Sequence, residues 1–173
     1  MQRVTDRKGG FTLEYPSSWN VYTKANDPNV NFIAGPDTKD TVLVRVFQNL
    51  GLSFAPGDSQ AEKQVVDALL ANLPISMIST TAVTYGGMSG WEYVYSFVDQ
   101  STQQVGVHIH LFLFQKYRLH TIVFQALPNT KLKSLARTFD QILSSYRALP
   151  LPVQSPTPIG NLPTPAASPT PTP

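Results

Sequence analysis

Two histidines separated by one residue are the side chains in this sequence whose type and spacing best suit chemistry. His108 and His110 lie within an alternating run, VGVHIHLFLF, at 105–114. Because residues i and i+2 of a β-strand point to the same face, both imidazoles could bind one metal ion. His120 would join them only if the turn at 115–118 has an odd loop length, since a two-residue loop places it on the other face. No acidic residue is obviously placed as a third ligand. A metal at His108 and His110 is therefore one hypothesis, and packing of both rings among aromatic side chains is the other.

A row of aromatic side chains just before the histidines could form the floor of a ligand pocket. The segment WEYVYSFV (91–98) carries an aromatic residue at every second position: Trp91, Tyr93, Tyr95 and Phe97. Pairing of Val98 with Val105 would place the two histidines opposite Tyr95 and Tyr93. Aromatic residues on strands mostly pack in the core, but a groove beside such a row can bind a small molecule. The candidate ligand-binding residues are Trp91, Tyr93, Tyr95, His108 and His110.

Motifs of catalysis are missing from the sequence. Met88-Ser89-Gly90 resembles a nucleophile elbow, but that motif needs one residue between the serine and the second glycine and a helix after it. Here Gly90 directly follows Ser89, and a strand is expected next. There is no glycine-rich phosphate loop, and the absence of cysteine excludes thiol nucleophiles, thiolate metal sites and disulfides. We therefore expect a protein that is not an enzyme and that has no cofactor, unless the histidine pair binds a metal.

The elements that must position these residues are strands and two helices. Period-two alternation and turn residues predict strands at 11–15, 19–23, 30–34, 41–47, 80–85, 91–98 and 105–124, the last bending at 115–118. A capping box at Ser59 and Glu62 predicts a helix that ends before Pro74. Asn129 is expected to cap a second helix with an apolar stripe reaching Tyr146. This order indicates an α+β fold, an antiparallel sheet of about six to eight strands sandwiched between helices.

Composition limits the partners and the compartment. The chain has 173 residues, a net charge of +2 and only 14% charged residues, against about 25% in an average domain. The weak charge and the missing basic track argue against nucleic acid as a partner. No segment is apolar for long enough to span a membrane, and the polar start at 1–10 is not a signal peptide. We expect an extracytoplasmic protein, in the periplasm, at the cell surface or in a thylakoid lumen, whose signal or anchor is missing from this sequence.

The composition changes abruptly near the end of the chain. Residues 1–149 can form one globular domain, whereas 150–173 contain nine prolines and no charge. Such a segment cannot form a core and is expected to be an extended, polyproline-like tail. It could serve as a spacer or stalk, could bind a polyproline-binding domain, or could have no particular role. Its lack of charge is more typical of linkers outside the cytoplasm than of signalling tails.

The two ends of the globular domain resemble a known family. Residues 11–19 (FTLEYPSSW) are similar to the Phe-x-Ile-x-Tyr-Pro-x-x-Trp opening of PsbP-like domains, and 139–146 (FDQILSSY) to their closing Phe-x-x-Ile-x-x-Ser-Phe helix. The resemblance covers 10–149 and includes photosystem II PsbP and DcrB-type bacterial envelope lipoproteins. It implies an α/β/α sandwich and a non-enzymatic binding scaffold. The chain lacks the long N-terminal segment of plant PsbP and carries an additional proline-rich tail, which favours a bacterial surface or envelope relative.

Three hypotheses about function follow from these observations. The first is an accessory domain that docks on a membrane-associated protein complex, in an unknown oligomeric state. The second is a carrier of a small molecule or lipid, with a pocket beside the aromatic row. The third is a metal-dependent accessory protein that uses His108 and His110.

Overall fold

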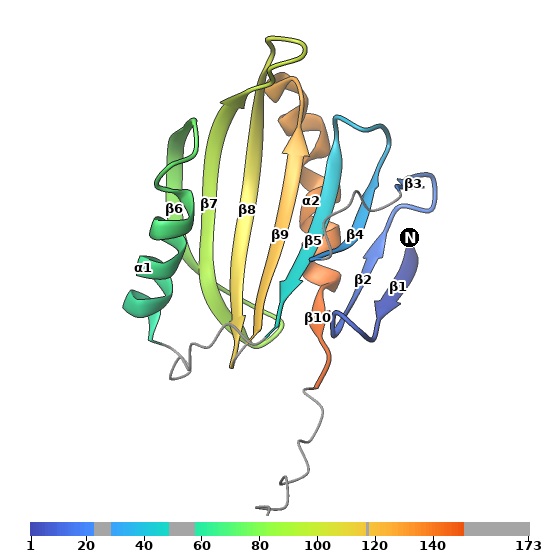
Figure 1. The fold of residues 1–173 in the computed structure, drawn as a ribbon. Coiled ribbons are helices and arrows are strands. Elements are labelled where there is room, and N and C mark those ends of the chain that lie inside the picture. Colours follow the sequence, from blue (N-terminus) through green and yellow to red (C-terminus); the bar gives the residue numbers. More distant parts are fainter. Residues whose placement is uncertain (23–28, 49–57, 117, 151–173) are drawn as a thin grey trace, which may run out of the picture.

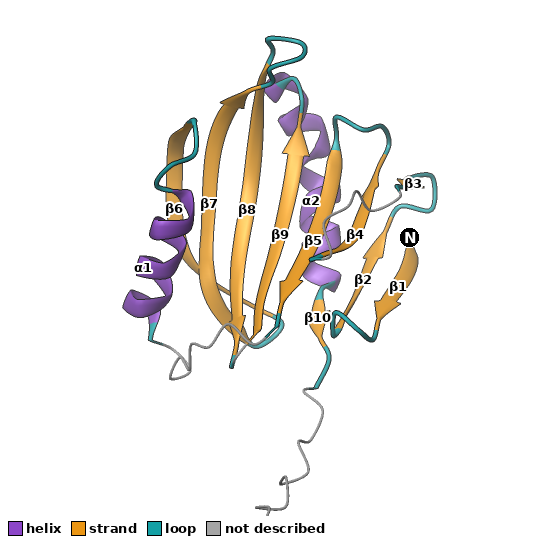
Figure 2. Ribbon diagram, in the orientation of Figure 1, coloured by secondary structure: helices purple, strands orange, loops and turns teal. Residues whose placement is uncertain are grey.

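The computed structural model describes residues 1–22, 29–48, 58–116 and 118–150. These residues form two antiparallel sheets and two α-helices (Figures 1 and 2). Nearly all of the proposed tail, 150–173, lies outside the described residues. No helix in the described ranges is long and apolar enough to cross a membrane.

The larger sheet has seven strands in the order β3-β4-β5-β9-β8-β7-β6. In chain order these are β3 (Asn20–Val21), β4 (Val30–Gly35), β5 (Thr41–Phe47), β6 (Ile75–Tyr85), β7 (Met88–Val98), β8 (Val105–Gln115) and β9 (Arg118–Ala126). A second sheet of β1 (Gln2–Asp6), β2 (Phe11–Tyr15) and β10 (Arg147–Ala148) has β2 at its centre. The helices are α1 (Ser59–Leu70) and α2 (Leu132–Ser145), and the 3-10 turn η1 (Asn129–Lys131) precedes α2.

One face of the seven-stranded sheet is covered by α2 together with the small sheet. Phe139 of α2 packs on Phe124 of β9 with ring centroids 4.8 Å apart, and Tyr15 of β2 packs on Phe32 of β4 at 5.1 Å. Leu111 of β8 is fully buried in this cluster. Each fully buried side chain of this size contributes roughly 1.5–3 kcal/mol. This face therefore holds the main core.

The opposite face is covered by α1 only on the side of the sheet near β6 and β7. Glu62, Val66 and Leu70 are buried at a four-residue spacing, so one stripe of the helix faces the sheet. Val66 and Leu70 join a second, smaller core cluster with side chains of β7, β8 and β9. In Figure 1, α1 lies in front of the β6 side of the sheet and α2 lies behind it. The expected α+β sandwich of helices about an antiparallel sheet is confirmed.

The structure corrects several expected boundaries near the start of the chain. β1 was not expected, because its sequence QRVTD shows no apolar alternation. In the structure its residues are mostly exposed. The strand expected at 19–23 is reduced to Asn20–Val21, with Thr23 outside the described residues. Pairing of β10 with β2 adds a second sheet that the sequence did not indicate.

The helix ends and β6 also differ from expectation. Asp58, not Ser59, caps α1, since its carboxylate accepts a hydrogen bond from the Ala61 amide at 3.1 Å. Asn129 does not cap a helix with its side chain but begins the 3-10 turn before α2. The helix α1 ends at Leu70 rather than just before Pro74, and β6 begins at Ile75 instead of Thr80.

A core substitution tests the doubly covered sheet. Leu111 is fully buried and Val105, on the same strand, is 43% exposed. We expect Leu111→Ala to lower the free energy of unfolding by about 2–5 kcal/mol, because it leaves a cavity between the sheet and α2. Val105→Ala serves as the matched control and is expected to cost less than about 1 kcal/mol. Urea denaturation measures both, and equal losses would contradict the described burial.

Candidate functional site

Tyr95 lies between the two histidines and binds both. The register pairs Val98 with Val105, as predicted, and so places His108 opposite Tyr95. The Tyr95 hydroxyl is 3.2 Å from Nδ1 of His108 and 3.0 Å from Nδ1 of His110. The second nitrogen of His108, Nε2, is 2.8 Å from Oε1 of Gln125 on β9. The three rings are therefore linked in one hydrogen-bonded chain across β7, β8 and β9.

The direction of each hydrogen bond follows from Gln125. Its Nε2 donates to the Lys39 carbonyl at 3.0 Å, so its Oε1 must accept from Nε2–H of His108. The Nδ1 of neutral His108 then has only a lone pair and accepts the Tyr95 proton. The Tyr95 oxygen in turn accepts from Nδ1–H of His110. This leaves Nε2 of His110 as a bare lone pair, and that atom is buried without a hydrogen-bond partner.

Burial keeps this chain neutral. Desolvation lowers the pKa of His110 to about 3, with smaller contributions from His108 and Arg45. Desolvation also lowers the pKa of His108 and raises that of Tyr95 to about 12. Both histidines are thus uncharged at neutral pH. A neutral, mutually bonded Tyr–His pair suits a buried polar network better than acid–base work.

His120 lies apart from this chain. Gln115 pairs with Arg118, which leaves two residues between the strands, so His120 falls on the α2 face as the two-residue case requires. Its Nδ1 is 2.7 Å from the Tyr146 hydroxyl, in the main core. Burial lowers the pKa of His120 to about 4.

The metal hypothesis for His108 and His110 stays a prediction. Hydrogen bonds to Tyr95 and Gln125 engage both nitrogens of His108 and one of His110. The described residues contain no group of three or more His, Cys, Asp or Glu side chains that could hold a metal ion. A metal at this position would have to break the chain of hydrogen bonds and recruit further ligands.

Two members of the aromatic row hold α1 in place. The Trp91 Nε1–H donates to the Ser59 carbonyl at 3.0 Å, and the Tyr93 hydroxyl donates to Asp67 at 2.6 Å. Tyr93 is 2% exposed. The sequence-predicted ligand residues are thus divided: Trp91 and Tyr93 lie under α1, while Tyr95 and the two histidines form the hydrogen-bonded chain.

Two small pockets lie beside α1, where the helix meets the β6 side of the sheet. The first, of about 230 Å³, lies between the first turn of α1 and the β6–β7 hairpin and includes Glu62, Thr84 and Ser89; we call it the acidic pocket. The second, of about 220 Å³, lies at the other end of α1 and includes Leu73 and Met77; we call it the apolar pocket. Drug-sized ligands usually occupy about 300–1,000 Å³. Neither pocket favours the carrier hypothesis, which remains a prediction.

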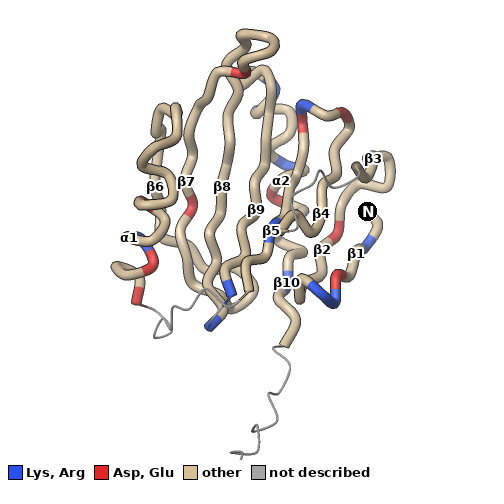
Figure 3. Tube along the Cα trace, viewed as in Figure 1, with Lys and Arg blue, Asp and Glu red and all other residues tan. Residues whose placement is uncertain are grey.

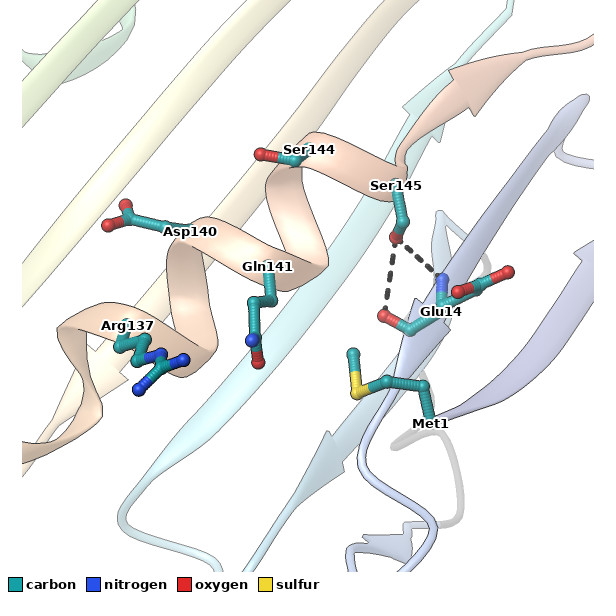
Figure 4. Close-up of a pocket in the computed structure, with 7 residues that line it drawn as sticks. All are labelled: Met1, Glu14, Arg137, Asp140, Gln141, Ser144 and Ser145. Atoms are coloured by element: carbon teal, nitrogen blue, oxygen red, sulfur yellow. Dashed lines mark hydrogen bonds between the residues drawn. The ribbon is translucent and has the colours of Figure 1, made fainter.

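The largest of the described pockets is a surface groove on the outer side of α2, of about 490 Å³ (Figure 4). Arg137 and Asp140 of α2 and Glu14 of β2 contribute charges of both signs to it. Ser145 anchors the end of α2 there, since its hydroxyl oxygen accepts from the Glu14 amide at 2.8 Å. The mixture of charges around an open groove gives no sign of a specific ligand.

Comparison with known proteins gives the fold. No protein-family model and no curated protein matches the sequence. Among solved structures, cyanobacterial PsbP (CyanoP) from Synechocystis aligns with a TM-score of 0.55 at 17% identity, over 85% of this chain and 91% of that chain. The chain has a PsbP-like fold. LpqN of Mycobacterium tuberculosis, involved in cell envelope biogenesis, aligns with a TM-score of 0.50 at 16% identity, over 81% and 83%. The Ran-binding protein Mog1p of Saccharomyces cerevisiae aligns with a TM-score of 0.54 at 9% identity, over 86% and 95%.

Sequence reasoning missed an exposed apolar edge of the large sheet. The sheet of described residues ends at β6, which pairs only with β7. Four large apolar side chains are exposed on and beside this edge: Leu69, Leu73, Met77 and Ile78. The signal was present in ISMISTTAVTY (75–85), which has no charge and no proline. An edge position cannot be read from one strand alone, because it depends on which strands pair.

The buried histidines predict how stability depends on pH. The folded-state pKa values of His108, His110 and His120 are all lowered, so the unfolded chain binds protons first as the pH falls below about 6.5. Stability is therefore complete above that pH and is lost on acidification toward pH 4, by up to about 1.4 kcal/mol per pH unit for each histidine. Denaturation between pH 7 and 5 measures the slope. His120→Gln should reduce this slope by up to about 1.4 kcal/mol per pH unit, the effect of one proton. A stability that does not change with pH in the unchanged protein would refute the assignment.

Proposed function

We propose that this PsbP-like domain is a non-enzymatic accessory domain that works outside the cytoplasm and docks on a membrane-associated protein complex through the edge of β6. The observation that carries the proposal is the character of this edge. An exposed strand edge presents unpaired N–H and C=O groups, to which an extended segment of a partner can add as a further strand. The similarity to CyanoP, to LpqN and to a Ran-binding protein supports a binding role rather than catalysis.

The other sheet edges of the described chain are protected, and β6 is not. β3, at the opposite end of the large sheet, and β10, at one edge of the small sheet, have two residues each. β1, at the edge of the small sheet, carries Arg3 and Asp6. β6 has eleven residues without charge or proline, and a single irregularity in its pairing, between Met77 and Ser79. Figure 3 shows charged residues along β1 and none along β6. Short strands and charges are the usual protection against unwanted pairing, so β6 is the edge best suited to a partner.

Apolar side chains beside β6 add to this surface. Ile78 is 62% exposed and Leu69 of α1 is 55% exposed. Large apolar side chains gathered at one place on a small domain mark interaction sites. An added strand would bury them together with its own backbone groups.

Site-specific photocrosslinking in cells tests the docking edge. A photoreactive residue at Thr81, exposed on β6, is expected to give a discrete adduct with a membrane-associated protein. The same residue at Lys133, exposed on α2, is the control and should give no such adduct. Adding Ile78→Lys should reduce the Thr81 adduct about tenfold, because a lysine on the edge opposes strand addition. Ser144→Lys on α2 should leave it unchanged, and equal adducts from both positions would count against docking at β6.

The compartment is tested separately. We expect the full-length protein to fractionate with the periplasm, the envelope or the lumen, in accordance with its low charge and its lack of cysteine. Immunoblotting of cell fractions, with a cytosolic enzyme as marker, measures this. Recovery with the cytosolic marker would refute the extracytoplasmic part of the proposal.

A further inference from the structure

The acidic pocket contains a buried carboxylate with one oxygen unengaged. Glu62 is 1% exposed, and its Oε1 accepts the Ser89 hydroxyl at 2.7 Å. Its Oε2 is buried and has no hydrogen-bond partner. Among the described residues no cation pairs with Glu62, since neighbouring Lys63 binds Asp67 at 2.6 Å. Burial of an unpaired carboxylate oxygen is costly, and a basic side chain entering the pocket would remove that cost.

The hydroxyl groups around the acidic pocket fit the same ligand. Ser59 and Thr84 line it together with Glu62 and Ser89. Hydroxyl oxygens can accept the remaining protons of an ammonium or guanidinium group. Because Oε2 lies below the pocket surface, the incoming cation is expected to draw the carboxylate toward itself. The carboxylate and the hydroxyls together select for a positive charge.

The apolar pocket at the other end of α1 selects for a different side chain. Its walls include Leu70 of α1, Leu73 just beyond the helix, and Ile75 and Met77 of β6. Asp67 and Tyr93 also line it and are hydrogen-bonded to each other. Leu73 and Met77 are each 48% exposed. An apolar side chain placed there would cover Leu73 and Met77 and contact their aliphatic groups, as anchor residues at interfaces do.

The two pockets are spaced for one strand. The apolar pocket adjoins Ile75 and Met77 on β6, and the acidic pocket adjoins Ala82 to Thr84. Met77 lines the apolar pocket and Thr84 the acidic pocket, and they pair with Tyr95 and Ser89 of β7. These two β7 residues are six positions apart, because β6 has one additional residue at the irregularity between Met77 and Ser79. Six residues of strand cover about 20 Å, and an even spacing points both side chains to one face.

We propose that the segment pairing with β6 carries an apolar residue and a basic residue six positions apart, the first bound in the apolar pocket and the second by Glu62. The order of the two depends on whether the added strand runs parallel or antiparallel to β6. This inference rests on the proposed docking at β6 and specifies the partner's chemistry. Main-chain hydrogen bonds would give affinity, and the two pockets would give specificity.

Selection from a random peptide library displayed on phage tests the inference with the intact chain. Peptides whose binding is abolished by Ile78→Lys are taken as β6 ligands. We expect these to be enriched in an apolar residue and a lysine or arginine six positions apart. Glu62→Gln keeps the size of the side chain and should weaken binding of such peptides about tenfold, a typical loss for one charge-assisted contact. Leu73→Ser should instead relax the apolar preference and keep the basic one.

The outcomes separate the two proposals. Glu14→Gln, on the remote strand β2, is the matched control and should leave binding unchanged. β6 ligands without the spaced pair, or with a basic residue that Glu62→Gln does not affect, would overturn this inference and leave docking at β6 intact. Absence of any ligand sensitive to Ile78→Lys would overturn both. Thermal unfolding of each variant confirms that it is folded.

Discussion

Strands β8 and β9 are apolar on both faces, and a sheet with such strands at its centre is stable only if both faces are covered. Nearly every residue of β9 is buried. The chain covers one face with α2 and the small sheet. It covers the other with the shorter helix α1, which packs mainly on β7. The need for two covers therefore determines where the helices lie. It also determines which part of the sheet stays available to a partner, namely the edge strand β6, which lies beside α1 but is not covered by it.

Several polar side chains inside this sandwich hydrogen-bond to one another. The link from Gln125 through His108 and Tyr95 to His110 crosses three strands, and the His120–Tyr146 bond connects β9 to the end of α2. Such networks fix one arrangement of the strands, because a slipped register would leave several buried groups unpaired. The histidines that looked most suited to chemistry thus help to specify the fold. The buried carboxylate of Glu62, which has one oxygen without a hydrogen-bond partner, lies instead at the margin of the sheet.

Local patterns predicted what depends on neighbours in sequence. Alternation located β7 and β8, and the loop between them gave the facing of Tyr95 and His108 correctly. The spacing of apolar residues located both helices, and the end motifs indicated the PsbP-like fold. The resemblance supplied more of the architecture than the residues did alone.

What the sequence did not predict depends on long-range pairing. β1 is a strand through its pairing with β2. Glu62 was assigned to a capping box from its neighbours in sequence, whereas its actual contact is with Ser89, twenty-seven positions away. Leu69 and Leu73 fitted the apolar stripe of a helix, yet both are exposed: Leu69 lies on the outer side of α1, and Leu73 lies beyond its last residue. The edge position of β6 follows from the strand order, which no segment encodes by itself.

The small sheet contains both the first strand of the domain, β1, and its last strand, β10. β1 and β10 lie on either side of β2, and in Figure 1 this sheet is at the opposite end of the molecule from β6. The large sheet alone separates its two edges by six strand spacings, on the order of 29 Å. If the domain were tethered through either flank, β6 would be the part farthest from the anchor. It would move through the largest distance as the tether bends. An edge placed in this way can reach a partner that is separated from the anchor.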